Sequence, residues 1–335
     1  MVRKPIWTGL LGLAALAAAC AVSSCRKPQG SAPGRGGSTG DISGDLVVFH
    51  AGSLSVPFRK VSEQFMKRHP QVRVKAEAAG SRDIARKVSD LGRACDVLGS
   101  ADYKVVENLL MPDHARFNIR FATNEIALTY TPRSACAGEI GAGNWHEVLL
   151  RDGVRFGRAD TDRDPCGYRT VMLFQLAERH YKLPGLAGRL AGKDGKRFIR
   201  PKETDLLALL EAGEIDYLFI YRSVGIQHHL KVLRLPDEIN LRNAEMSGLY
   251  RTATVEVTGK KPGELMTRRG EAIVYSVTIP AKSPNRRAAE AYVAFLLSDE
   301  GRRVLSDCGQ GLISPAIADG WQHLPEGLRR FCRKG

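Results

Sequence analysis

Two glycine–serine pairs stand where a strand is predicted to turn into a helix. Gly52 and Ser53 follow the apolar run that begins after Asp45, and a second pair, Gly80 and Ser81, follows an alternating run over residues 72–79. A serine hydroxyl beside the free amides of a helix N-terminus can hold an anion without any charged side chain. The same pair is also typical of an ordinary turn with a serine cap, so each pair alone leaves both interpretations open.

A third segment with possible chemistry is Asp164, Pro165 and Cys166, at the start of a helix predicted within residues 162–181. Proline in the first turn leaves the amides that follow it free to donate hydrogen bonds. The simpler interpretation is an aspartate cap followed by proline at the first helical position, a local arrangement that stabilises a helix by about 1 kcal/mol.

Two further polar residues stand next to predicted elements. Glu203 lies in the segment 200–205, which leads into an amphipathic helix, and Tyr221 ends an apolar run over residues 217–221. Their own positions favour a solvated turn and a core or rim tyrosine.

The elements that would position these residues alternate along the chain, which predicts an α/β fold. Since helices separate successive strands, we expect a mostly parallel sheet, with ligands bound at the carboxyl ends of its strands. Apolar runs predict strands over residues 124–131, 153–160, 217–221 and 272–280, and helical spacing predicts helices over residues 53–70, 203–216 and, as two segments, 285–309.

The first residues have the order of a secretory signal: Arg3 and Lys4, an apolar stretch, then small residues. We expect residues 1–24 to be a signal peptide. The residues before Cys25 fit the bacterial lipoprotein pattern better than those before Cys20, so Cys25 is the expected lipid attachment site and Cys20 the alternative. Residues 25–44 are rich in Gly, Ser and Pro and predict a flexible tether.

Composition narrows the class of protein. The chain has 335 residues, 43% of them hydrophobic and 26% charged, as in soluble globular proteins. No apolar run after the first two dozen residues is long enough to span a bilayer, which excludes a polytopic membrane protein. The net charge of +14 invites a nucleic-acid function, but the basic residues are spread along the chain, acidic residues interleave with them, and no nucleic-acid motif occurs. A positive field also favours small anions.

Five cysteines follow Cys25, and their pairing cannot be read from the sequence. Export permits disulfides, but no two of the five have the spacing of a structural zinc site. They are Cys95, Cys136, Cys166, Cys308 and Cys332.

Taken together, these segments resemble the archaeal-type tungstate/molybdate-binding proteins, the solute-binding components of ABC importers. The resemblance runs from about residue 45 to residue 317. The segments that carry it are FHAGSL (49–54), EAAGSRD (77–83), RKVSDLG (86–92), DVLGSADY (96–103), FATNEIALTYT (121–131), DRDPCGYR (162–169), residues 201–230, LPDEINL (235–241) and GQGLISP (309–315).

The resemblance implies a type II periplasmic-binding-protein fold, with two α/β lobes joined by two crossing strands and a ligand cleft between them. The expected crossings lie near residues 121–128 and 272–279. Lobe one would then comprise residues 45–122 and 277–335, and lobe two residues 123–276.

The resemblance also implies the ligand site. Gly52, Ser53 and Ser81 match residues that bind oxyanion oxygens, and Tyr221 matches a hydroxyl donor. Asp164, with Pro165 and Cys166, matches a helix start whose aspartate and amides face the ligand, and Glu203 matches a second carboxylate.

Two carboxylates in an anion site would repel the anion unless they bind its central atom directly. Molybdenum(VI) and tungsten(VI) can take extra oxygen ligands and sulfur in sulfate is not expected to, so Asp164 and Glu203 would coordinate the metal directly and discriminate against sulfate.

The implied function is capture of tungstate or molybdate for an ABC transporter permease, by a monomeric exported protein that a lipid holds at the membrane. No cofactor, catalysis or nucleic acid is expected. Binding of another oxyanion such as sulfate is the main alternative. An exported hydrolase using the paired carboxylates and a surface interaction protein are more distant alternatives, since no nucleophile motif occurs.

Overall fold

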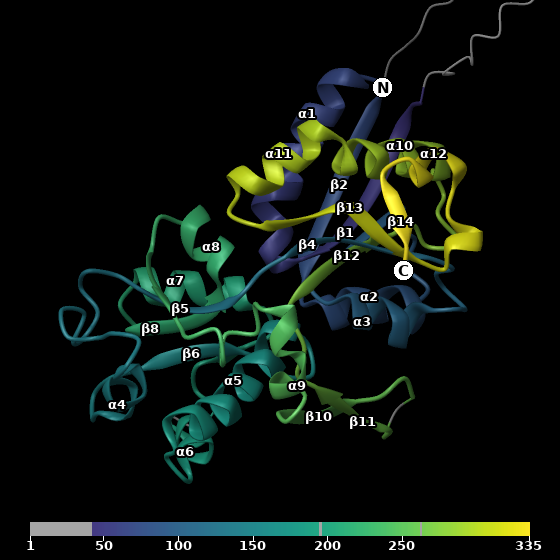
Figure 1. The fold of residues 1–335 in the computed structure, drawn as a ribbon. Helices are drawn as coiled ribbons and strands as arrows, with labels where there is room; N and C mark the ends of the chain where they lie inside the picture. Colours follow the sequence, from purple (N-terminus) through teal and green to yellow (C-terminus); the bar gives the residue numbers. More distant parts are fainter. Residues whose placement is uncertain (1–41, 194–195, 262) are drawn as a thin grey trace, which may run out of the picture. The chain divides into compact units, whose positions relative to one another are not determined.

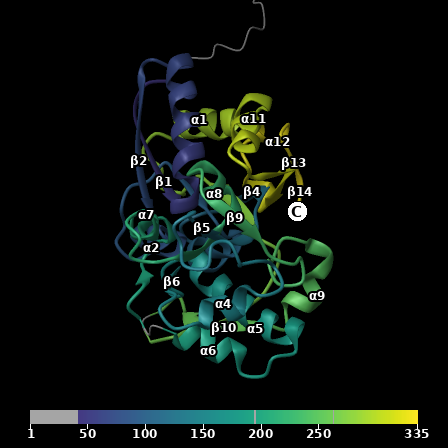
Figure 2. The same cartoon turned by 90° about the vertical axis from the view of Figure 1, so that its left-hand side faces the viewer.

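The computed structural model describes residues 42–193, 196–261 and 263–335. The predicted signal peptide, Cys20, Cys25 and most of the predicted tether lie outside the described residues. Figure 1 shows the fold, with a view turned by 90° in Figure 2.

The described chain forms two lobes, each built around a sheet. The larger sheet has seven strands in the order β14-β13-β4-β12-β3-β1-β2, and the smaller has five in the order β7-β6-β8-β5-β9. The strands of the larger sheet are β1 (Gly44–Ala51), β2 (Val72–Ala79), β3 (Val97–Ser100), β4 (Asn118–Thr123), β12 (Val274–Thr278), β13 (Gly311–Asp319) and β14 (Cys332–Lys334). Those of the smaller sheet are β5 (Ile126–Tyr130), β6 (Phe156–Ala159), β7 (Ile199–Arg200), β8 (Tyr217–Tyr221) and β9 (Lys231–Arg234).

Helices cover both faces of the larger sheet (Figure 1). Leu46 and Val48 of β1 pack into the same cluster as Phe58 and Phe65 of helix α1, whereas Phe49 joins a separate cluster with helix α2. Alternate residues of one buried strand therefore serve two cores, because successive side chains point to opposite faces. The helices of this lobe are α1 (Ser55–Arg68), α2 (Ser81–Ser89), α3 (Tyr103–Val105), α10 (Arg286–Leu297), α11 (Asp299–Asp307) and α12 (Glu326–Arg329), with the turns η1 (Gly52–Leu54), η2 (Val106–Leu110, π-helical) and η5 (Trp321–His323).

The smaller sheet packs against helix α5, whose buried face extends from Pro165 to Ala177. Phe174 of this helix makes edge-to-face contacts with Phe156 and Phe219 of the sheet. A two-stranded hairpin, β10 (Thr254–Thr258) and β11 (Leu265–Arg269), follows this sheet in the chain. The helices that remain are α4 (Trp145–Leu150), α5 (Pro165–Tyr181), α6 (Leu186–Gly192), α7 (Leu207–Glu211), α8 (Arg222–Gln227) and α9 (Ser247–Tyr250), with the turns η3 (Glu203–Leu206) and η4 (Ala244–Met246).

The predicted alternation of strands and helices is confirmed, but the expectation of a mostly parallel sheet is wrong. In the larger sheet β1 is parallel to both of its neighbours, whereas β12 is antiparallel to β3 and β4. In the smaller sheet β5 is antiparallel to β8 and β9. The physical reason is that the chain leaves the larger sheet through β4, enters the smaller one through β5 and returns through β12, so these strands run against the parallel units.

The described cysteines are all free thiols, Cys136 and Cys332 half-buried and the rest buried. Within the described ranges, no helix is both long and apolar enough to cross a membrane.

Candidate functional site

The two glycine–serine turns lie side by side at the carboxyl ends of neighbouring strands. Gly52 and Ser53 form η1 directly after β1, and Ser81 begins α2 just after β2. Because β1 and β2 are parallel and in register from end to end, the two turns meet at one sheet edge. Both serines are buried, Ser53 with 1% of its surface exposed and Ser81 with none.

Asp164, Glu203 and Tyr221 belong to the smaller lobe. Asp164 caps α5, Glu203 begins η3, and Tyr221 is the last residue of β8. Their exposed fractions are 2%, 1% and 0%. Pro165 and Cys166, the first two residues of α5, are buried as well. The folded chain therefore places every predicted site residue in its interior.

Two glycines bring the lobes into contact at the site. A Cβ atom at Gly52 would lie 2.7 Å from Cγ of Lys202, the residue before Glu203. One at Gly80 would overlap the carbonyl oxygen of Arg163, the residue before Asp164. The amide of Arg82 donates to that same carbonyl at 3.2 Å. The absence of a side chain at both glycines thus lets the two serine turns approach the two carboxyl groups.

The serine hydroxyls accept hydrogen bonds from the protein. The Tyr275 hydroxyl donates to Oγ of Ser53 at 2.9 Å, and the amide of Ala101 donates to Oγ of Ser81 at 3.0 Å. Within the described part of the chain, neither serine hydroxyl has an acceptor for its own proton. Each is therefore free to donate to a ligand.

The Tyr221 hydroxyl likewise accepts a hydrogen bond from the protein and keeps a free proton. Its hydroxyl oxygen accepts from Nη1 of Arg169 at 2.9 Å, and its proton has no acceptor among the described residues. The three hydroxyls are neighbours through shared contacts, since Arg169 bonds both Tyr221 and Ala101, and the Tyr221 ring lies 5.6 Å from that of Tyr275. Donors grouped in this way suit the oxygen atoms of an anion.

The two carboxyl groups are placed differently from each other. Oδ1 of Asp164 accepts from the amide of Cys166 at 2.8 Å, and Oδ2 accepts from the amide of Glu203 at 3.3 Å. The carboxyl oxygens of Glu203 make no hydrogen bond of acceptable geometry with any described residue. A buried carboxyl group without a partner is costly, so a partner from outside the chain would stabilise it.

Burial raises the pKa of both carboxyl groups. For Glu203 the pKa lies well above 4.5, first because of desolvation and then because of the charge of Asp164. Burial also raises the pKa of Asp164, although the neighbouring carboxyl group of Glu203 and, after it, the amides of Cys166 and Glu203 partly offset that rise. The site therefore resists holding two negative charges when nothing compensates them.

The start of α5, which the resemblance places at the ligand, already uses its first amide within the chain. Pro165 has no N–H, and the amide of Cys166 is occupied by the Asp164 cap. The Cys166 thiol donates to the carbonyl of Phe219 at 3.7 Å, and burial raises its pKa, so it remains a neutral packing residue.

Arg169 is a site residue that sequence reasoning missed. Its Nη1 donates to the Tyr221 hydroxyl and, at 2.7 Å, to the carbonyl of Ala101 in the other lobe. Its Nη2 lies 3.4 Å from Oδ2 of Asp102, which also pairs with Arg268 at 2.8 Å. Arg169 thus holds the Tyr221 hydroxyl and joins both lobes and the hairpin through the buried carboxylate of Asp102.

The sequence carries a weak signal for Arg169 and none for its counterpart Tyr275. An arginine one turn after Pro165 and Cys166 interrupts the buried face of α5 and could have been noticed. Tyr275 lies in an ordinary apolar strand, and its bonds to Ser53 and, at 3.1 Å, from Asn124 exist only in the folded chain.

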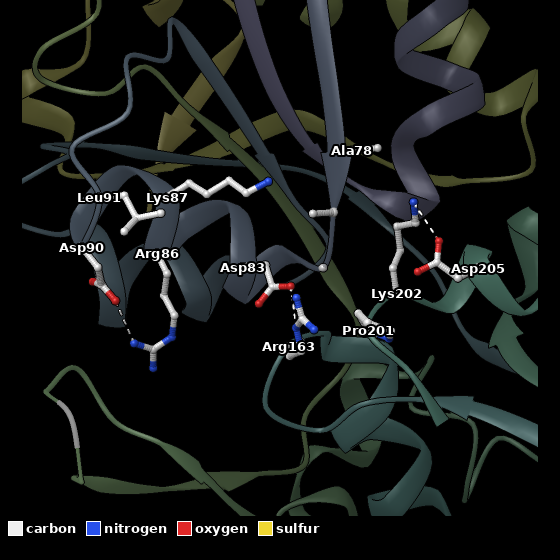
Figure 3. A pocket seen from close by; sticks show the side chains of 12 residues that line it. Ala78, Asp83, Arg86, Lys87, Asp90, Leu91, Arg163, Pro201, Lys202 and Asp205 are labelled. Carbon is white, nitrogen blue, oxygen red and sulfur yellow. Dashed lines mark hydrogen bonds and ion pairs between the residues drawn. The ribbon is translucent and has the colours of Figure 1, made fainter. Parts of the chain in front are cut away.

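A pocket of about 400 Å³ lies directly outside these residues, where Gly80, Arg163 and Lys202 line both sides (Figure 3). Its cations are matched by acids, so the pocket has little excess charge and selectivity must come from the buried groups. The pairs are Arg163–Asp83 at 2.8 Å, Lys202–Asp205 at 3.0 Å, Arg86–Asp90 at 3.1 Å and Lys87–Glu77.

Further contacts from α2 hold the lobes together. Nε of Arg82 donates to the carbonyl of Asp162 at 2.6 Å, and its Nη2 donates to that of Thr258. Nη2 of Arg86 donates to the carbonyl of Gly259 at 2.7 Å. These bonds all join the two lobes, so opening of the lobes would require them to break.

Within the described ranges, no group of three or more His, Cys, Asp or Glu side chains could hold a metal cation. The site offers three hydroxyl donors and two carboxyl groups. That set fits an oxygen-rich anion whose central atom accepts carboxylate oxygens.

Comparison with known proteins identifies the family. Residues 46–309 match the family described as bacterial extracellular solute-binding protein. The chain belongs to this family. Solute-binding proteins of this kind bind small molecules outside the cytoplasm, in agreement with a closed cleft between two lobes.

Relatives of this solute-binding protein cover most of its length. It is 46% identical over 295 residues to an uncharacterised solute-binding protein of Petrotoga mobilis, a match that covers 88% of this chain and 92% of the relative. It is 37% identical over 319 residues to the molybdate/tungstate-binding protein WtpA of Pyrococcus abyssi, covering 87% and 90% of the two chains. The periplasmic molybdate-binding protein of Azotobacter vinelandii has the same fold, with a TM-score of 0.59, 17% identity and coverage of 80% and 99%.

Proposed function

We propose that this solute-binding protein captures tungstate or molybdate between its lobes and delivers it to an ABC transporter permease. One observation carries the ligand class: three buried hydroxyls with free protons surround a site where the carboxyl oxygens of Glu203 have no partner within the described chain. The named function of the Pyrococcus abyssi relative supports the same ligands.

In this proposal the hydroxyls of Ser53, Ser81 and Tyr221 hold oxo groups of the anion. Asp164 and Glu203 each offer one oxygen to the metal, which can take oxygen ligands in addition to its oxo groups. Gly52 and Gly80, which have no side chain, allow the two lobes to come into close contact at the site. No chemical conversion of the ligand is involved.

The carboxyl groups would provide selectivity. Sulfate would form no bond to the oxygens of Asp164 and Glu203, so nothing would compensate the charge of these carboxyl groups, and repulsion by any ionised one is strong where water is excluded. The hydroxyl donors alone would serve sulfate equally well, so the discrimination rests on the carboxyl groups.

We extend the proposal to the protein's place in the cell. A lipid on Cys25, followed by the tether over residues 25–44, would hold a monomeric binding protein at the membrane, close to its permease. The proposed lobes comprise residues 45–122 with 277–335, and residues 123–276.

Calorimetric titration with tungstate, molybdate, sulfate and phosphate tests the proposal. We expect tight one-to-one binding of tungstate or molybdate and no response to sulfate. Glu203→Gln should weaken tungstate binding by about a hundredfold, the order expected when one bond to a charged group is lost. Glu214→Gln, which changes an exposed glutamate, is the matched control. Equal affinity for sulfate, or an unchanged tungstate affinity in Glu203→Gln, would remove Glu203 from contact with the ligand.

A further inference from the structure

A second polar pocket lies where the chain crosses between the lobes. It has a volume of about 320 Å³ and is lined in part by Thr123, Asn124 and Glu125, which connect β4 to β5. None of its lining residues is one of the hydroxyls or carboxyl groups of the ligand site. The pocket is therefore a separate cavity at the hinge.

Three arginines and one glutamate give this hinge pocket its charge. The Glu125 carboxylate is buried and is shared by two guanidinium groups, with Nε of Arg222 at 3.4 Å and Nε of Arg234 at 3.3 Å from the same oxygen. Its other oxygen accepts from Nδ2 of Asn240 at 3.1 Å. The single negative charge of Glu125 is thus shared between the positive charges of Arg222 and Arg234.

The third arginine, Arg242, has no hydrogen-bond or ion-pair partner for its side chain among the described residues. It follows Leu241, a buried residue held at a φ of 61°, which leucine rarely adopts. The backbone at Leu241 is in turn fixed by the amide of Ile273, which donates to its carbonyl at 2.9 Å. The strained backbone at Leu241 therefore precedes the residue, Arg242, whose free guanidinium group lines the pocket.

We propose that the hinge pocket binds a small phosphate-type oxyanion. The lining arginines exceed Glu125 by two positive charges. A concave site with this excess concentrates anions, and guanidinium groups match tetrahedral oxyanions with paired hydrogen bonds. The pocket outside the ligand cleft differs, because each of its cations already has an acidic partner.

Both lobes contribute walls to the hinge pocket. The arginines belong to the smaller lobe, whereas Gly309 lies just before β13 of the larger lobe and Gly311 begins that strand. Nε2 of Gln227 donates to the carbonyl of Cys308 at 2.9 Å and ties these walls together. Opening of the lobes would change the spacing of the walls, so an anion bound here would be linked to occupancy of the ligand cleft.

Calorimetric titration of the full chain with inorganic phosphate tests the proposal, in the presence of saturating tungstate so that the cleft is occupied. We expect one phosphate per chain, and Arg242→Gln should weaken it about tenfold, as loss of a charge-assisted bond does. Arg251→Gln, which removes an exposed arginine away from the pocket, should leave it unchanged. Glycerol 3-phosphate in place of phosphate shows whether the free ion or a monoester fits better.

Two results would overturn the hinge site. One is no phosphate binding at up to about 10 mM, an affinity too weak to matter. The other is an equal effect of Arg242→Gln and Arg251→Gln, which would mean that phosphate responds to overall charge. In a titration without tungstate, loss of phosphate binding in Ser53→Ala, with retention in Arg242→Gln, would place phosphate in the cleft and would also overturn the hinge site. Tungstate titration of Arg242→Gln reports on the cleft separately.

Discussion

At the scale of single residues, Glu203 stands out because its carboxyl group is buried next to that of Asp164, and its oxygens make no hydrogen bond of acceptable geometry with any described residue. We predict that ligand-free protein loses stability as pH rises. Below 4.5 the group is protonated in both states; above that, the folded state keeps a proton that the unfolded state has released. Between the pKa of Glu203 in the unfolded state and its higher pKa in the folded state, each pH unit lowers the free energy of unfolding by about 1.4 kcal/mol.

Denaturant unfolding at about pH 5 and pH 8 measures this slope. In Glu203→Gln the slope should become shallower, and the ligand-free variant should be more stable than the original protein at the higher pH. Glu214→Gln serves as the control. Identical slopes in all three proteins would contradict the pKa shift of Glu203.

Arg169 gives a second prediction for single residues. If it acts by holding the Tyr221 hydroxyl, Arg169→Lys should weaken tungstate binding by about tenfold or more, the value of a hydrogen bond to a charged group, because lysine lacks the planar fork that reaches Ala101 and Tyr221 together. In a Tyr221→Phe background, Arg169→Lys should weaken tungstate binding much less. Calorimetry on the four proteins of this double-mutant cycle measures the coupling, and additive effects would show that Arg169 does not act through Tyr221.

At the scale of elements, the turn from β2 into α2 must pass close to the segment before α5. Gly80→Ala would push a methyl group into the carbonyl of Arg163. We expect this variant to fold, since each lobe keeps its core, but to bind tungstate at least about a hundredfold more weakly because closure is blocked. Gly138→Ala, where the added methyl meets open space, is the control for titration. Normal affinity in Gly80→Ala would mean that this contact is not needed for binding.

At the scale of the whole molecule, the closed state depends on bonds between lobes as well as on the ligand. Arg82 is buried in α2, yet it donates to carbonyl groups of Asp162 and Thr258 in the other lobe. Arg82→Gln should therefore shift the population towards open molecules and raise the rate of tungstate dissociation by about tenfold. Arg93→Gln, whose partner Glu77 lies in the same lobe, is the control.

Stopped-flow dissociation and small-angle scattering measure the two effects of Arg82. We expect the ligand-free variant to be more extended than the original protein and to become compact when tungstate saturates it. An unchanged dissociation rate would show that the Arg82 bonds do not hold the lobes closed.

The sequence by itself determined the α/β alternation, the two glycine–serine turns and the residues that could meet a ligand, because these depend on neighbours within a few positions. Apolar spacing specifies a strand or helix, and a serine after a strand end specifies where a hydroxyl stands. Even so, local patterns could not separate Asp164 as a cap from Asp164 as a ligand, and the structure shows it in contact with the amides of Cys166 and Glu203.

Only the tertiary structure decided how these residues act together. The bond from Tyr275 to Ser53 joins residues 222 positions apart, and the ion pair of Arg268 with Asp102 joins residues 166 apart. The direction in which each hydroxyl donates, the burial of Glu203 beside Asp164 and the antiparallel crossings between sheets all follow from such distant contacts. Their physical origin is the packing of two lobes against each other, which brings together groups that no local sequence pattern connects.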